Sequence, residues 1–290
     1  MVLAHTPFDG SSSPFSIALT PLDLSQWLEI DDALEAYLAE KERLRALHPE
    51  KVFVEEPQTR QSQQDVMDAI MSWLPAQYPG TYNLSRDLVK ISGSGREIRL
   101  DAAGEAPLLT ASKLVQEDLV IMRRGESGWR LAAASLSFPS SWSLLEKFGR
   151  PMHEIHAPVP GFGAGTRNAA LIERMFDNLR PSNPVKRFNW SISRDGELYH
   201  PVAVCKNDMV SETAFLRVER QTLRKMQHSG DILFTIRICL DPLTALKIHV
   251  NARGLAHSLA AQLMALSVEE LGYKGLSVVR DRLVNDLKSF

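Results

Sequence analysis

Two strand-like segments joined by a glycine-containing turn constrain the fold of this chain most. Residues 119–124, LVIMRR, and residues 129–138, WRLAAASLSF, flank the turn Gly125-Glu126-Ser127-Gly128. Apolar and aromatic runs on both sides of a short turn with Gly predict a β-hairpin. Because a hairpin pairs its strands antiparallel, any sheet that contains it is at least partly antiparallel.

Further strand-like and helix-like segments extend this prediction over the chain. The strands are expected at residues 97–101, 187–193, 216–223 and 230–240, and the helices at 31–47, 62–73, 143–156, 168–179 and 254–272. The strands lack regular βαβ spacing, which favours an antiparallel sheet. Such a sheet, curved around one hydrophobic pocket with short helices on its other side, is an α+β fold of PAS-like type. We expect one domain, with an N-terminal helical region over about 1–75, a core over about 90–245 and a C-terminal helical region over about 250–290.

Composition limits the classes of function. The chain has 290 residues, of which 44% are hydrophobic, enough for a substantial core. Its 33 basic residues nearly balance 35 acidic ones, so neither a nucleic acid nor an anionic membrane is an expected partner. No apolar run reaches the roughly 18 residues of a membrane span, and the first residues do not resemble a signal peptide. The expected compartment is the cytoplasm.

The two cysteines, Cys205 and Cys239, are too few for a disulfide framework or for an iron-sulfur cluster, which needs about four ligands. We expect both to be reduced. Cys239 lies in the apolar run ILFTIRICL, which favours a place in the core.

His153 and His156 are the clearest candidates for a metal or haem ligand. They stand three residues apart and would share one face of a helix that Pro158 and Pro160 bring to an end. An imidazole at a helix end is a common haem ligand. The alternative is a histidine that caps helix carbonyl groups and complements the helix dipole.

Several separated strings of the sequence resemble one known family. These strings are VQEDLVIM, FPSSW, EKFGRPMHEIHAPVPGF, RFNW and LRVERQTLRKMQHSGDILFTIR. Together they are similar to the α subunit of haem-dependent oxidative N-demethylase, and the resemblance extends from about Pro21 to Gly275.

The resemblance implies a PAS-like sheet that forms one wall of a pocket for haem b. It also implies an oxygen-using oxidoreductase, in which a secondary methylamine such as dimethylamine loses a methyl group as formaldehyde. Electrons come from NADPH, and flavin, iron-sulfur and tetrahydrofolate components lie on partner subunits. A haem-binding gas or redox sensor without turnover is the alternative function, and a protein that kept the fold and lost haem is a third.

Under this resemblance, His156 is the first choice for the axial ligand and His153 the second. The haem propionates need positively charged donors. The candidates are Lys147, Arg150, Arg187, Arg217, Arg220 and Arg237.

An amine substrate is a cation and requires a carboxylate or an aromatic face. Glu219 is the candidate carboxylate, unless it forms an ion pair with Arg217 or Arg220. Trp142 and Trp190 are candidate pocket walls, with core packing as the alternative for both. Glu117 and Asp118 are adjacent on a strand and face opposite ways, so at most one is expected to point inward.

Overall fold

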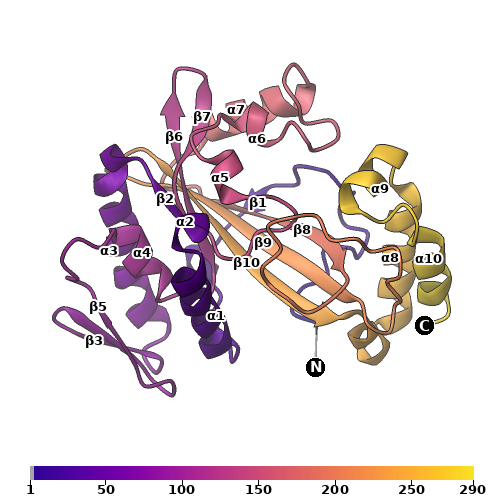
Figure 1. The fold of residues 1–290 in the computed structure, drawn as a ribbon, viewed down its shortest axis with the longest axis horizontal. Helices are drawn as coiled ribbons and strands as arrows, with labels where there is room; N and C mark the ends of the chain where they lie inside the picture. The colour runs from indigo at the N-terminus through magenta and orange to yellow at the C-terminus, as the bar shows by residue number, and fades with distance from the viewer. Residues whose placement is uncertain (1–2) are drawn as a thin grey trace.

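A seven-stranded antiparallel sheet lies at the centre of the computed structural model, which describes residues 3–290 (Figure 1). Its strand order is β1-β8-β9-β10-β6-β7-β2. The predicted hairpin is confirmed as β6 and β7, which pair from Leu119 opposite Ser135 to Gly125 opposite Gly128. Gly128 closes the turn with a φ of 109°, a conformation that favours glycine. The strands are β1 Thr20–Pro21, β2 Phe53–Glu55, β6 Asp118–Gly125, β7 Gly128–Ser135, β8 Val185–Ser193, β9 Phe215–Lys225 and β10 Ile232–Pro242.

A second, three-stranded sheet lies apart from the first. It contains the strand that was expected at residues 97–101, so that segment does not join the central sheet. Its strands are β3 Tyr82–Ser85, β4 Leu88–Ile91 and β5 Arg96–Arg99.

Two predicted helices are interrupted in the structure. The helix expected at 143–156 is two four-residue helices, because Gly149 has a φ of 74° and Pro151 follows. The helix expected at 254–272 divides at Ser267, whose side chain and that of Glu270 form a capping box. The helices are α1 Leu34–Leu47, α2 Pro49–Val52, α3 Arg60–Gln77, α4 Pro107–Ser112, α5 Leu144–Lys147, α6 Met152–Ile155, α7 Arg167–Asn178, α8 Ala252–Ala265, α9 Val268–Lys274 and α10 Arg280–Lys288.

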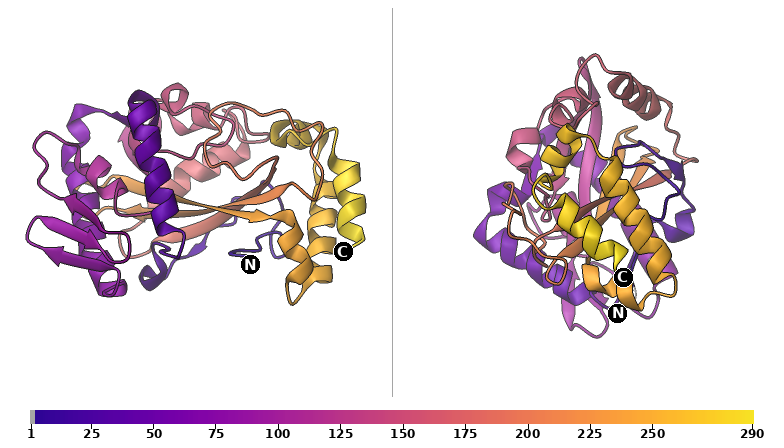
Figure 2. Two further views of the ribbon diagram at one scale, coloured as in Figure 1. Left: turned by 60° about the horizontal axis from the view of Figure 1, so that its bottom comes forward. Right: turned by 90° about the vertical axis from the view of Figure 1, so that its right-hand side faces the viewer.

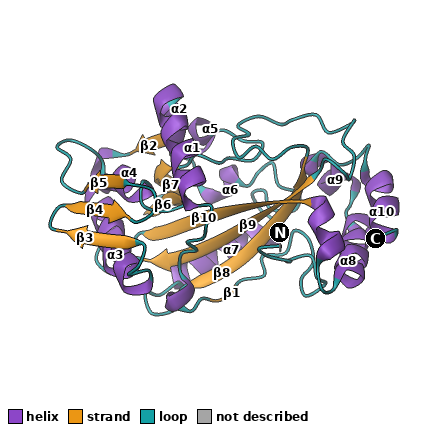
Figure 3. Ribbon diagram, turned by 90° about the horizontal axis from the view of Figure 1, so that it is seen from below, coloured by secondary structure: helices purple, strands orange, loops and turns teal. Residues whose placement is uncertain are grey.

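Both faces of the central sheet are covered. Helices α5 to α7 pack over one face, where Met152 and Phe176 share a hydrophobic cluster with Ile236 of β10. Towards one end of the molecule lie α3 and the small sheet, and towards the other lie α8 to α10 (Figure 2, Figure 3). Mixed helices and antiparallel sheets confirm the α+β prediction. The short helices over one face are the arrangement on which the PAS-like prediction depends.

The adjacent acids Glu117 and Asp118 are both buried, so the expectation that at most one points inward is wrong. They do face opposite ways, but each side of the sheet is covered. Asp118 accepts hydrogen bonds from the backbone N–H groups of Ser137 and Phe138, and Glu117 accepts one from that of Glu29.

Candidate functional site

A row of polar side chains crosses one face of the central strands β8 and β9. Antiparallel pairing sets Arg187 opposite Gln221 and Asn189 opposite Glu219. Cross-strand partners project from the same face of a sheet, so these four side chains form one continuous row. On the next strand, β10, Ile238 lies beside Glu219 and continues this face with an apolar side chain.

This face is only partly covered. All four residues of the polar row are half-buried, although they lie on central strands of the sheet. The apolar residues at the edge of the adjoining cluster are half-buried as well. They include Phe15, Trp142, Leu198, Phe234 and Leu240. Polar groups that remain accessible among apolar neighbours are typical of a binding site.

His156 is held in place at the C-terminal end of α6. Its backbone N–H donates to the carbonyl oxygen of Met152 over 3.0 Å, and its own carbonyl accepts from Val159 over 2.8 Å. Its ring lies 6.3 Å from that of Phe162, centroid to centroid. The two bonds fix the backbone from which the imidazole projects, and the ring of Phe162 lies beside it.

The ring of His156 is suited to bind a metal. Burial, together with the positive charges of Arg187 and Lys147, lowers its pKa to about 4. The ring is therefore neutral at neutral pH. Nδ1 lies 3.1 Å from the carbonyl oxygen of Met152, a contact in which Nδ1 carries the proton and donates. In that tautomer Nε2 keeps its lone pair, which is the state that an axial histidine ligand requires.

His153 lies within α6 and is half-buried. The predicted long helix is broken, so the two histidines do not share one of its faces. His153 lies within the short helix α6, and His156 is the residue that caps its C-terminal end. No side-chain hydrogen bond orients the His153 ring within residues 3–290. Of the two histidines, His156 is the one whose ring has a hydrogen-bond partner. Which of them binds a metal stays a prediction.

Two basic side chains lie close to His156. Lys147 donates from Nζ to the carbonyl oxygen of Ile155 over 2.8 Å, and burial lowers its pKa. Arg187 donates to the carbonyl oxygen of Ser16 over 3.2 Å, but its buried Nε has no hydrogen-bond partner. Burial lowers the pKa of Arg187, and the charge of Glu219 opposes that effect. Arg187 therefore has capacity to bind an additional anion.

Three arginines proposed for the haem propionates have carboxylate partners in the protein. Arg150 is exposed and pairs with Glu154 over 3.2 Å. Arg220 projects from the opposite face of β9, where Nε pairs with Glu29 over 2.8 Å and Nη1 donates to the carbonyl oxygen of Trp27. Arg220 is thus a buried structural residue, which corrects the expectation that it binds haem. Arg237 is likewise on that face and pairs with Asp31 over 2.8 Å.

Arg217 is on the same face as the polar row. It is buried, and its two Nη atoms donate to the carbonyl oxygens of Leu198 and Phe138 over 3.2 and 2.7 Å. Its Nε has no partner. Burial lowers its pKa, and nearby carboxylates including Glu219 oppose that effect. These carbonyl bonds hold the guanidinium beside the loop that contains Leu198.

Glu219 forms no ion pair with Arg217 or Arg220 within 4.0 Å. Its Oε2 accepts hydrogen bonds from Gln221 over 2.9 Å and from Asn189 over 3.4 Å. Two neutral amides thus hold one carboxylate oxygen, and Oε1 has no hydrogen-bond partner within residues 3–290. The predicted alternative, a structural ion pair, does not occur in the structure.

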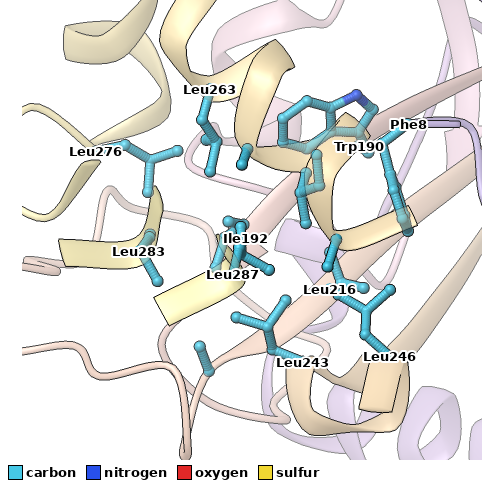
Figure 4. Packing of buried hydrophobic residues seen from close by; sticks show 14 of the residues in the cluster. Phe8, Trp190, Ile192, Leu216, Leu243, Leu246, Leu263, Leu276, Leu283 and Leu287 are labelled. Carbon is cyan, nitrogen blue, oxygen red and sulfur yellow. The ribbon is translucent and has the colours of Figure 1, made fainter. Parts of the chain in front are cut away.

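The two tryptophans have different environments. Trp190 is buried in the cluster between the sheet and the C-terminal helices, with Leu263 and Phe8 nearby (Figure 4). Its Nε1 donates to Gln262 over 3.1 Å. It lies on the face opposite the polar row, so Trp190 packs in the core and is not a wall of a pocket on the polar-row face. Trp142 is half-buried at the edge of the cluster under α5 to α7.

Asn189 and Gln221 are site residues that the sequence prediction omitted. The signal was present, because Asn189 is two residues from Arg187 and Gln221 two residues from Glu219. Residues two apart on a strand share a face. Choosing Glu219 for the site therefore implied its neighbour Gln221.

A half-covered sheet face with a fixed, neutral histidine and an unpaired buried arginine defines an α+β protein with a candidate cofactor site on its sheet. The family model described as "Haem-dependent oxidative N-demethylase, alpha subunit-like" matches residues 18–284. The chain belongs to this family, which places it among haem-dependent oxidative N-demethylase-like proteins. No helix in residues 3–290 combines the length and apolar character needed to cross a membrane.

Proposed function

We propose that this protein uses haem and dioxygen to N-demethylate a small secondary methylamine and release formaldehyde. The observation that carries the proposal is the neutral ring of His156, with Nδ1 engaged and Nε2 free, near a partly open polar row that includes Glu219. Family membership supports the general reaction class, and these residues support its location on the α6 face of the sheet.

The cofactor proposed for this face is haem b, and the donor groups present there support a haem. His156 would bind the haem iron through Nε2, with His153 as the second candidate. The unpartnered Nε of Arg187 and the ammonium of Lys147 would bind the propionates, because buried cations without carboxylate partners favour anionic ligands. Trp142 would line the edge of the cofactor site. Haem bound in this way supplies the activation of dioxygen.

The chain's own contribution to substrate binding centres on Glu219. Asn189 and Gln221 both donate to Oε2, which fixes the carboxylate and leaves Oε1 to accept a hydrogen bond from a secondary ammonium group. A charge-assisted bond of this kind orients the amine and its methyl group in one direction. The half-buried setting excludes part of the solvent and strengthens the attraction.

Electrons must reach the site from a partner. We propose a reductase-type partner that draws on NADPH, with flavin, iron-sulfur and tetrahydrofolate components on separate subunits as in the resemblance described above. The two cysteines of this chain, one exposed and one buried, are free thiols. They are not the ligands of a cluster that needs about four cysteines.

The experiment combines haem titration with product analysis. Adding haem to the haem-free protein should give a Soret band that saturates at one equivalent. His156→Ala should lose or alter this band, whereas His153→Ala should keep it, with circular dichroism to verify folding of both. With dimethylamine, dioxygen and a chemical reductant, the wild type should release formaldehyde.

Each failure has a distinct meaning. Loss of the band only in His153→Ala would move the axial ligand to His153. Absence of a Soret band in the wild type would overturn the proposal. A haem protein that binds carbon monoxide reversibly and releases no formaldehyde would instead be a sensor.

A further inference from the structure

A small polar cavity lies at the end of β8 and β9 beyond the polar row. Its lining includes Ser191, Ser193, His200, Lys206 and Arg217. Its enclosed part measures about 20 Å³, room for about one water molecule, and the rest of the cavity is open to solvent. Hydroxyl, imidazole, ammonium and guanidinium groups converge there, so its lining is rich in hydrogen-bond donors.

Two cations of the cavity lack a carboxylate partner within 4.0 Å in residues 3–290. Arg217 is 1% exposed and uses its two Nη atoms on backbone carbonyls, which leaves Nε unpaired. Lys206 donates from Nζ to the carbonyl oxygens of Ile192 and Lys274 over 2.8 and 2.9 Å. An ammonium has three donors, so one remains. Neither cation has an ion-pair partner, so an anion placed between them would be attracted by both charges.

The one lining carboxylate does not fill that role. Asp195 lies 3.0 Å from Nε2 of His200 and accepts the backbone N–H of Glu197. Arg194, also at the cavity, pairs with Asp208 over 3.2 Å. Arg217 and Lys206 are therefore the cations of the cavity lining that have no ion pair within residues 3–290.

The walls of the cavity are fixed relative to each other. His200 donates its backbone N–H to the carbonyl oxygen of Pro139 over 3.2 Å, and its own carbonyl accepts from Ser141 over 2.7 Å. These bonds join the loop that contains His200 to the segment after β7. A site with fixed walls loses little entropy when a ligand binds.

We propose that this cavity is a carboxylate-binding site, in which Arg217 and Lys206 bind the two oxygens and the serine hydroxyls complete the contacts. The carboxylate has two possible sources: a free small-molecule carboxylate, or a propionate of a bound haem. Binding of a free carboxylate does not depend on haem, so it can be tested separately from the proposed catalytic function.

Acetate binding to the haem-free protein, measured by isothermal titration calorimetry, tests the site. Lys206→Gln keeps an amide donor for the carbonyl oxygens but removes the charge, and it should weaken acetate binding about tenfold or more. Ser193→Ala should weaken it less. Lys51→Gln, which removes an exposed lysine in α2, is the matched control and should bind as the wild type does. Equal affinities in Lys206→Gln and wild type would overturn the proposal.

The pH dependence gives a second readout. Burial and the charge of Arg217 lower the pKa of Lys206 to about 8, and Asp195 opposes this effect. Lys274 also faces this ammonium, through its carbonyl oxygen and its own charge. Acetate affinity should therefore fall between about pH 7 and about pH 9 in the wild type, and should change less in Lys206→Gln. A parallel fall in both proteins would contradict the assignment to Lys206.

Haem and its dimethyl ester separate the two sources. If a propionate occupies the cavity, haem should abolish acetate binding and the ester should not. If the occupant is a free carboxylate, acetate should bind equally well in the presence of either. If acetate binding is undetectable, haem affinity decides. Lys206→Gln that binds haem and the ester as tightly as the wild type would then overturn the proposal. Lys206→Gln that binds haem more weakly than the wild type, but the ester equally well, would support a propionate in the cavity.

Discussion

Replacing His156 by Gln should change how the stability of the haem-free protein depends on pH. Burial lowers the pKa of this ring to about 4 from its ordinary 6.5, so the folded state excludes a proton that the unfolded chain binds. The stability that follows from this exclusion is fully present above about pH 6.5 and is lost as the pH falls toward about 4.

The size of the effect follows from the shift. One pKa unit corresponds to about 1.4 kcal/mol, so the shift of His156 removes about 2.5 kcal/mol of folding free energy between about pH 7.5 and about pH 4.5. His156→Gln has no proton to bind at this position. The wild type should therefore lose about that much more stability than the variant over this range.

Urea denaturation followed by tryptophan fluorescence at several pH values measures the difference. Comparing the two proteins at each pH cancels the contributions of other groups, including the buried acids Glu117 and Asp118. His228→Gln, which removes an exposed histidine between β9 and β10, controls for the loss of an imidazole. A difference between wild type and His156→Gln that stays constant within about 0.5 kcal/mol would refute the burial of a neutral ring.

Three further substitutions separate structural from functional residues. Glu219→Gln should leave the Soret band unchanged and weaken amine binding about 10- to 100-fold, because a charge-assisted hydrogen bond is lost; equal amine affinity would contradict the role of the carboxylate. Arg220→Met should lower the free energy of unfolding by about 3–5 kcal/mol in urea, since Glu29 and the carbonyl oxygen of Trp27 both lose the guanidinium; a change below about 1 kcal/mol would contradict a structural pair. Trp190→Ala should lower the free energy of unfolding by about 3–5 kcal/mol in the same measurement and leave the haem affinity of the folded protein unaltered. A loss of haem affinity without a loss of stability would place Trp190 at the site.

The central sheet was predictable because its strands are apolar or aromatic runs and its hairpin turn is short. The patterns placed β6, β7, β8, β9 and β10 within about two residues of their observed bounds, apart from the end of β7, which stops at Ser135. The helix breaks were harder to predict. Gly149 and Pro151 interrupt a pattern that otherwise has helical spacing, and Ser267 followed by Glu270 is a capping signal inside a longer apolar stretch.

The site was predicted less completely because both faces of the sheet are buried. Alternation tells which residues share a face, but it does not tell which face is the functional one. Arg217 and Arg220 both lie on β9 and looked equivalent in the sequence. One reaches the face of α5 to α7, and the other reaches Glu29 in the N-terminal segment, a contact of residues 191 positions apart that no local pattern encodes.

The arginines on β8, β9 and β10 have different partners on the two faces of the sheet. On the face away from α5 to α7, Arg220 and Arg237 have carboxylate partners, and Arg224 stacks over the ring of Trp27 at 4.4 Å. On the α5 to α7 face, Arg187 and Arg217 have neither an ion pair nor a ring partner within residues 3–290. A buried guanidinium with a partner stabilises a fold, whereas one without a partner is costly to the fold unless a ligand supplies the counter-charge. The same face contains His156 and Glu219, so anionic ligand groups are expected there and not on the opposite face.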